Sequence, residues 1–227
     1  FFLVAGIHVF AAGSMAMVKA GSTPSTATRR GMGGDIKAGF AYAASDRAML
    51  GVILLMLLST LFGSSYWALM PAWAREALDV QSDGLGILMT IMGVGALVGT
   101  LGLAAIPNIK RRGLVLLASC LIWGVALAAF SQTTSYSVAV PFLLVLGLVS
   151  AVFMSLNMTM MQLLAPPEMR GRMMAIGMMS FGAMPLSALP FGALAEARDS
   201  TADALFLSGI LLVVATLIFW VAYPTFR

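Results

Sequence analysis

Charge is scarce in this chain, and its distribution is more informative than its amount. Only 10% of the residues are charged, against roughly a quarter in soluble domains. Asp, Glu, Lys and Arg are absent from five long stretches: 48–74, 84–109, 113–167, 173–195 and 204–226. A hydrocarbon core about 30 Å thick needs roughly 20 apolar residues per helix. These stretches therefore exclude an ordinary soluble fold and predict a polytopic membrane protein.

The five charge-free stretches predict six spans, because 113–167 is long enough for two helices, with the polar residues 131–135 as the turn between them. We expect an all-α bundle within residues 48–227, with consecutive spans as antiparallel neighbours joined by short loops. The spans are expected at about 48–70, 84–105, 114–131, 138–164, 173–194 and 204–223.

Two segments precede this bundle. Residues 1–18 are apolar and predict one further helix. Residues 19–47 start as a Gly-, Ser- and Thr-rich tether and end in a short predicted helix with Asp35 as its N-cap. The apolar face of that helix places it either along the membrane interface or against the bundle. Because the chain begins at Phe1 without a Met or a basic flank, we expect earlier spans upstream.

Cysteine and histidine each occur once, as Cys120 and His8. One cysteine allows no internal disulfide and no cysteine-based metal site, and His8 has no acidic partner in its helix. The phosphate-loop pattern G-x-x-x-x-G-K-[ST] and the metalloprotease pattern H-E-x-x-H are both absent. These absences argue against an enzyme, against ATP as an energy source on this chain, and against any cofactor or metal.

Carboxylates are also absent from every complete predicted span. A transporter coupled to protons or sodium normally needs an intramembrane acid or a cluster of oxygen ligands. Any such coupling group must therefore lie on residues outside this sequence. The net charge of +4 is spread over the loops and forms no single patch, so nucleic acid is not an expected partner.

The loops between the spans alternate in charge. Basic residues dominate 19–47, 106–112 and 165–172, whereas acidic residues dominate 75–83 and 196–203. Lys and Arg favour the cytoplasmic side of a membrane, so the three basic segments and the C-terminus are predicted to be cytoplasmic. The residues that mark two of these loops are Lys110, Arg111, Arg112, Arg170 and Arg172.

Two sequence features predict how the helices pack and bend. Gly95 and Gly99 form a G-x-x-x-G pair in a glycine-rich span, which favours close approach of a second helix. The pair is either a fixed structural contact or a sliding interface for alternating access, and both roles are compatible. Pro185 and Pro190 predict breaks in the span 173–194, because each lacks a backbone donor.

Candidate binding residues lie in two spans. Met154, Asn157 and Met161 share one helical face with Ser150, and an amide among thioethers is typical of an adaptable cavity wall. The alternative is that methionine fills the core while Asn157 bonds to a neighbouring helix. Tyr66 lies near the outer end of the span 48–70, where it fits a ligand wall or an aromatic belt.

The motifs of this chain resemble one branch of the major facilitator superfamily. Residues 71–78, P-A-W-A-R-E-A-L, are similar to the P-x-x-A-R-E-x-L of bacterial drug, macrolide and siderophore exporters. Residues 93–99, G-V-G-A-L-V-G, resemble the same branch, and so do residues 157–172, N-M-T-M-M-Q-L-L-A-P-P-E-M-R-G-R. The likeness covers nearly the whole chain, as helix six, the central loop and helices seven to twelve.

The resemblance implies the C-terminal half of a twelve-helix exporter in a bacterial inner membrane. Its partners would be the lipid bilayer, a small amphipathic substrate and the N-terminal half of the same protein, which would carry proton coupling. Tyr66, Met154, Asn157 and Met161 would line the cavity between the halves, and Arg170 and Arg172 would anchor topology and contact acidic helix ends. The alternatives are a membrane assembly or permeability protein without a transport cycle, and a six-span protein that acts as a homodimer.

Overall fold

A computed structural model of the protein describes residues 2–17, 32–80, 82–106 and 109–226, and the described residues form helices and no strands. The chain divides into two units, residues 1–30 and 31–227. The first unit contains α1 (Phe2–Ala16), an apolar helix of 15 residues. The second unit holds the six helical segments that are long and apolar enough to cross a membrane. The all-α, six-span fold expected from the sequence is therefore confirmed.

Four of the six spans are continuous helices, and two are interrupted. The continuous spans are α5 (Ser82–Ala104), α6 (Arg112–Ser131), α7 (Tyr136–Leu164) and α10 (Thr201–Ala222). The first span, Arg47–Leu78, consists of α3 (Arg47–Leu58), a π-helical segment η1 (Ser59–Gly63) and α4 (Ser65–Leu78). The fifth span, Arg170–Arg198, consists of α8 (Arg170–Phe181) and α9 (Met184–Arg198). A short 3₁₀ turn, η2 (Pro224–Phe226), follows α10.

The linker helix, α2 (Met32–Ser45), begins earlier than the sequence suggested. Asp35 lies inside this helix and not before it, so its assignment as an N-cap is wrong. The residues of the Gly-, Ser- and Thr-rich tether at 18–31 lie outside the described part of the chain. Helix α2 packs against α3 and α8, and the Tyr42 hydroxyl donates to the Leu164 carbonyl at 3.3 Å. Ile36 and Phe40 of its predicted apolar face remain exposed, while Ala43 is buried.

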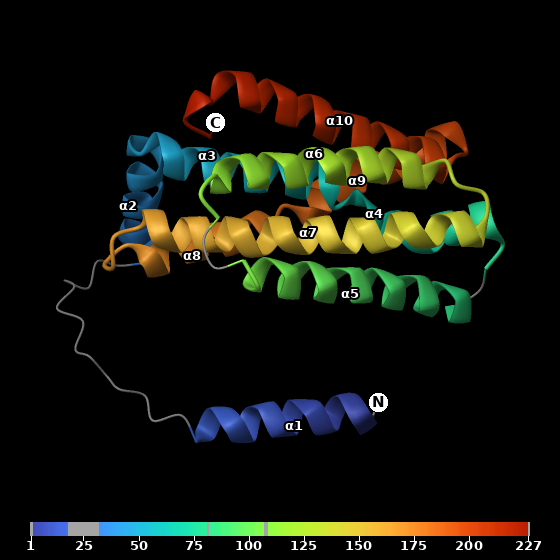
Figure 1. Ribbon diagram of the computed structural model, residues 1–227, viewed down its shortest axis with the longest axis horizontal. Helices are drawn as coiled ribbons and strands as arrows, with labels where there is room; N and C mark the ends of the chain where they lie inside the picture. Colours follow the sequence, from blue (N-terminus) through green and yellow to red (C-terminus); the bar gives the residue numbers. More distant parts are fainter. Residues whose placement is uncertain (1, 18–31, 81, 107–108, 227) are drawn as a thin grey trace. The chain divides into compact units, whose positions relative to one another are not determined.

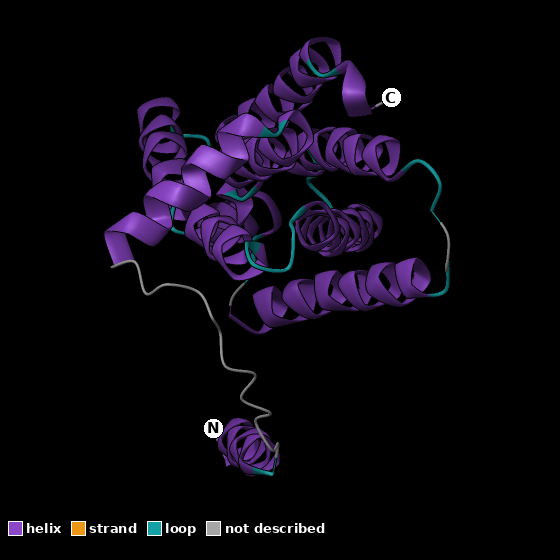
Figure 2. Ribbon diagram, turned by 90° about the vertical axis from the view of Figure 1, so that its left-hand side faces the viewer, coloured by secondary structure: helices purple, strands orange, loops and turns teal. Residues whose placement is uncertain are grey.

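Helix α7 lies in the interior of the bundle and contacts both α5 and α6, and α10 packs on the other side of α6 (Figure 1). The end-on view shows the remaining helices grouped beside this row (Figure 2). Large apolar side chains fill the space between the helices, among them Trp73, Phe130 and Phe153. The Trp73 ring lies 4.1 Å from that of Phe130, and its indole N–H donates to the Ser131 carbonyl at 3.1 Å.

Glycine allows the two closest helix crossings. In the α5–α7 crossing, a Cβ at Gly95 or Gly99 would overlap the carbonyl oxygens of Leu144 or Leu148, and a Cβ at Gly147 would overlap that of Met92. In the α6–α10 crossing, a Cβ at Gly124 would lie 2.8 Å from the carbonyl oxygen of Gly209. Backbone lies directly against backbone at both crossings, as expected where helices associate in lipid by packing.

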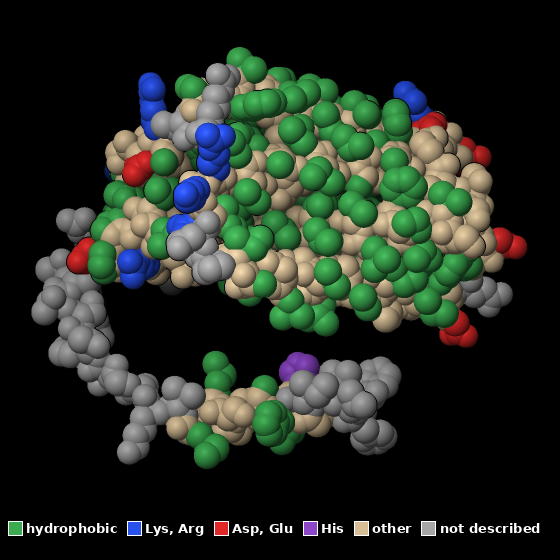
Figure 3. Space-filling model, in the orientation of Figure 1, with side chains coloured by type: hydrophobic (Ala, Val, Ile, Leu, Met, Phe, Trp, Pro, Cys, Tyr) green, Lys and Arg blue, Asp and Glu red, His purple; other side chains and the backbone are tan. Residues whose placement is uncertain are grey.

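The charged side chains of the bundle gather at its two ends, with apolar surface between them (Figure 3). The first, third and fifth spans begin at one end with Arg47, Arg112 and Arg170. The opposite end carries the acidic residues Asp79, Asp83, Glu196, Asp199 and Asp203. We call these the basic end and the acidic end of the bundle.

Candidate functional site

The interruption of the first span is built from small and polar residues. Residues 59–63, S-T-L-F-G, form the π-helical turn, and Ser64 and Ser65 follow it. A π-helical turn leaves backbone carbonyls without their usual helical partner. Here the Ser208 hydroxyl of α10 bonds to the Phe62 carbonyl and lies 2.5 Å from the Ser65 hydroxyl. A side chain of α10 therefore satisfies a carbonyl within the interruption.

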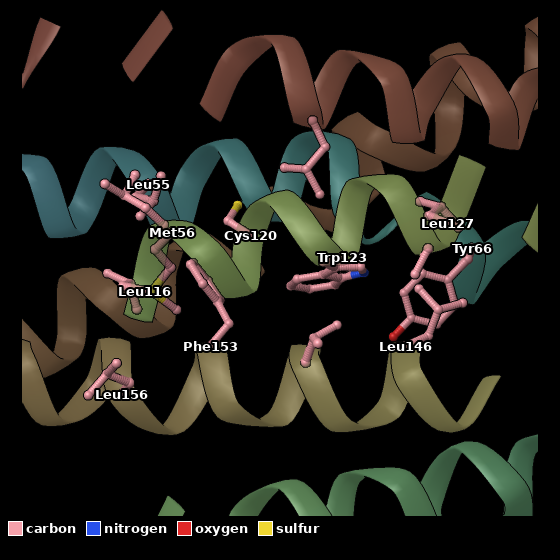
Figure 4. Close-up of a cluster of buried hydrophobic side chains, with 14 of the residues drawn as sticks. Leu55, Met56, Tyr66, Leu116, Cys120, Trp123, Leu127, Leu146, Phe153 and Leu156 are labelled. Carbon is pink, nitrogen blue, oxygen red and sulfur yellow. The ribbon is translucent and has the colours of Figure 1, made fainter. Parts of the chain in front are cut away.

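An aromatic cluster covers the interruption on the side of α6. Trp123 extends from α6 toward α7, between Phe153 and Tyr66 (Figure 4). Its ring lies 5.9 Å from that of Phe153 and 6.5 Å from that of Tyr66, both edge to face. A Cβ at Gly63 would lie 3.2 Å from the Trp123 ring, so glycine allows the indole to sit directly against the π-helical turn.

The interruption of the fifth span lies at Gly182 and Ala183. Helix α8 ends at Phe181, and α9 begins at Met184 with Pro185 in its first turn, where a missing N–H removes no helical bond. Pro190 lies inside α9 without breaking it, although its ring leaves the Leu186 carbonyl without a helical donor. Of the two predicted breaks, only the one near Pro185 coincides with an interruption of the helix.

The two interrupted spans lie against one another, because α9 contacts both η1 and α4. Each contributes a buried hydroxyl with no hydrogen-bond partner: Thr60 on η1 and Ser187 on α9. The Trp123 indole N–H is likewise buried without a partner. Unpaired buried polar groups are rare and costly, so we take the elements that carry these three groups as the candidate site. The site offers neutral donors and acceptors in an aromatic setting, and it has no charge for acid–base chemistry.

The predicted lining residues on α7 lie inside the bundle. Asn157 and Met161 are fully buried, and Met154 is partly buried. The side-chain amide nitrogen of Asn157 donates to the Val52 carbonyl of α3 at 3.0 Å. The oxygen of the same side-chain amide has no hydrogen-bond partner. The Met161 sulfur lies 3.1 Å from where a Cβ at Gly177 of α8 would be. These residues thus join α7 to α3 and α8.

Tyr66 is also buried, but it lies at a different level along α7 from Asn157 and Met161. Ser150 of α7 lies within hydrogen-bonding reach of the Tyr66 side chain. Asn157 lies seven residues further along α7, which is about 10 Å at 1.5 Å per residue. The four predicted lining residues therefore do not form one cluster. Their exposure to a substrate stays a prediction, and it requires α7 to separate from α3 and α4.

The predicted loop residues lie at the basic end. The Arg170 side chain donates to the Ala165 carbonyl at 3.3 Å. This bond ties the loop before α8 to the first residue of α8. Arg172 contacts the Met169 sulfur at 3.2 Å. Lys110, Arg111 and Arg112 lie at the start of α6 and line a cavity there. Within the described ranges, no group of three His, Cys, Asp or Glu residues could hold a metal.

One contact at the acidic end was not predicted. The Glu76 carboxylate of α4 accepts hydrogen bonds from the Thr201 backbone N–H at 2.9 Å and from the Thr201 hydroxyl at 2.6 Å. It therefore caps the N-terminus of α10, where the helix dipole favours a negative charge. The residues A-R-E at 74–76 were noted as part of a motif, but the sequence alone did not identify the partner of this carboxylate.

The described residues form an all-helical bundle with six helices able to span a membrane and no charged side chain among those that are buried. This architecture agrees with one half of a membrane transporter of the major facilitator type. The chain belongs to the transmembrane secretion effector family of that superfamily, whose family model matches residues 1–225. No curated protein matched the chain. Membership in this family makes the chain a multi-pass membrane transport protein.

Proposed function

We propose that this protein is a secondary active transporter that exports an amphipathic small molecule, of the drug, macrolide or siderophore kind, by alternating access. The observation that carries the proposal is the contact between the two interrupted spans. Discontinuous helices near the middle of a membrane supply binding groups in many transporters and also serve as points of flexion. The unpaired hydroxyls of Thr60 and Ser187 occur at these interruptions.

The chemistry of the site favours a mostly apolar ligand with a few hydrogen-bonding groups. Aromatic and thioether side chains supply adaptable contact surface, and a few neutral polar groups fix the ligand's orientation. In this proposal Tyr66 and Trp123 form one wall, and Met154, Asn157 and Met161 form another once α7 separates from α3. This interior supplies no buried countercharge, so a cationic ligand would find one only on the N-terminal half of the protein.

The remaining parts of the proposal concern the setting of the transporter. The chain would act in a bacterial inner membrane with its C-terminus in the cytoplasm. It would pack against an N-terminal half of the same protein that supplies the proton-coupling acid. Arg170, Arg172 and the cluster Lys110, Arg111 and Arg112 would anchor the cytoplasmic side and contact acidic helix ends during gating.

The test is efflux of the fluorescent cation ethidium from bacteria that lack their own drug exporters and express the complete protein. We expect several-fold slower efflux for Thr60→Val and Ser187→Ala than for the parent. These hydroxyls have no partner, so their removal leaves no other group unpaired and should not destabilise the fold. Thr90→Val is the matched control, because the Thr90 hydroxyl is exposed and bonds only within its own helix.

The proposal would be contradicted if cells that express the protein exported ethidium and erythromycin no faster than cells without it. Tryptophan fluorescence then separates the alternatives, because Trp67 and Trp123 both lie beside Tyr66. A flat titration with all the candidate ligands would favour an assembly or permeability protein without a transport cycle. Ligand-dependent quenching in a dimer of this chain would favour the six-span homodimer.

A further inference from the structure

The cavity beside Lys110, Arg111 and Arg112 lies at the basic end of the bundle, and none of the candidate-site residues described above lines it. Its volume is about 330 Å³, which is within the range of small-molecule sites. Three spans and the C-terminal turn supply its walls. The lining residues are Ala48, Ile109, Lys110, Arg111, Arg112, Gly113, Met160 and Phe226.

One side of this cavity is cationic. Lys110, Arg111 and Arg112 are consecutive, and no carboxylate is among the lining residues. The carboxylate closest to it along the chain, Asp46, accepts hydrogen bonds from the backbone N–H groups of Ala48 and Met49 and so caps α3. The start of α6 has no side-chain cap, so its backbone N–H groups add to the positive field.

The other side of the cavity is apolar and held in place. Phe226, which is 4% exposed, forms this wall and packs edge to face on Phe219 with the ring centres 5.4 Å apart. It fits against two glycines, since a Cβ at Gly51 would overlap its ring and a Cβ at Gly113 would lie 2.8 Å from its carbonyl oxygen. Ala48, Ile109 and Met160 complete the apolar lining.

We infer that this cavity binds the phosphate headgroup of an anionic membrane phospholipid, with the start of the acyl chains against the Phe226 wall. Three cations beside an apolar wall match the chemistry of a phosphodiester joined to hydrocarbon. The cavity also lies at the end of the bundle, where its apolar surface gives way to charge, which is the depth of a lipid headgroup. This inference does not rest on the proposed transport activity.

Native mass spectrometry of the complete, delipidated protein in detergent tests the inference by titration with dioleoyl phosphatidylglycerol and with dioleoyl phosphatidylcholine. We expect preferential binding of the anionic lipid. A cation near a membrane surface contributes about 1 kcal/mol, so Arg112→Gln should weaken that binding about fivefold and Arg111→Gln/Arg112→Gln on the order of 25-fold. Ala48→Phe should also weaken it more than about tenfold, because it fills the cavity without changing its charge.

Arg75→Gln is the matched control, since it removes the same charge at the acidic end and should leave lipid binding unchanged. Equal binding of the two lipids, or equal binding by the parent and the three cavity variants, would overturn the inference. Displacement of the lipid by millimolar inorganic phosphate would also overturn it, because the cavity would then recognise a soluble anion. Ala48→Phe keeps every basic residue, so it separates loss of the cavity from an altered membrane orientation.

Discussion

At the residue scale, the bundle depends on positions where one added carbon atom would meet backbone. Gly147→Ala would place a methyl group against the Met92 carbonyl, which cannot rotate away. We expect a loss of at least about 2 kcal/mol of unfolding free energy, because α5 and α7 must separate. Gly93→Ala on α5 is the control, since nothing lies within 4 Å of its Cβ position. Unfolding in detergent followed by circular dichroism measures both, and equal stability of the two variants would contradict the crossing described.

The Glu76 cap is a second test at this scale. Glu76→Ala removes the acceptor for both Thr201 donors and should lower the unfolding free energy by about 1 kcal/mol. Thr201→Val should cost less, because it removes the hydroxyl bond and keeps the backbone one. A double-mutant cycle of thermal unfolding gives the coupling between the two residues. A coupling of zero would show that the bond from the Thr201 hydroxyl to Glu76 contributes nothing to stability.

The sequence predicted which residues share a face but not what covers that face. Met154, Asn157 and Met161 were placed on one face of their helix by the 3.6-residue period. The period does not reveal that α3 lies against this face, so the bond from Asn157 to the Val52 carbonyl was only one of two alternatives. The Glu76–Thr201 contact joins residues 125 positions apart, and local patterns do not encode such a pairing.

At the element scale, the interrupted spans differ in how visible they were in the sequence. Breaks in the fifth span were expected at Pro185 and Pro190, because each lacks a backbone donor, and only the first coincides with an interruption. The π-helical turn at Ser59–Gly63 contains no proline and lies in a long apolar run. Its signal was the cluster of small hydroxyl residues, and those residues also occur in regular membrane helices. The first span therefore extends to Leu78 as two helices and a π-helical turn, beyond the expected end at residue 70.

Ser208 tests whether this turn is held from outside. Ser208→Ala removes the donor to the Phe62 carbonyl and the partner of the Ser65 hydroxyl. We expect a loss of about 1–3 kcal/mol, because buried polar groups are left unpaired. Ser119→Ala is the control, since the Ser119 hydroxyl bonds only to the Val115 carbonyl of its own helix. Thermal unfolding in detergent compares the two variants, and a Ser208→Ala protein as stable as the control would show that the turn needs no support from α10.

At the scale of the whole molecule, the alternation of loop charge agrees with the separation of basic and acidic ends in the structure. The side of the membrane that each end faces is a prediction. In a Cys120→Ser background, which removes the only cysteine of this sequence, a membrane-impermeant maleimide should label Asp79→Cys in intact cells and not Lys110→Cys. The reverse labelling would mean that the basic end faces outward, against the expected asymmetry of Lys and Arg.

The central claim is that motion in this transporter is concentrated at the interruptions of its first and fifth spans. Spin labels at Asp79→Cys and Asp203→Cys report the separation of α4 from α10, and labels at Lys110→Cys and Gln162→Cys report the basic end of α6 and α7. Pulsed electron–electron resonance on the complete protein, in the Cys120→Ser background, measures both distances with and without ethidium. We predict that ethidium shifts the distance distribution of the first pair and leaves that of the second unchanged. A first-pair distribution that is the same with and without ethidium would contradict the account.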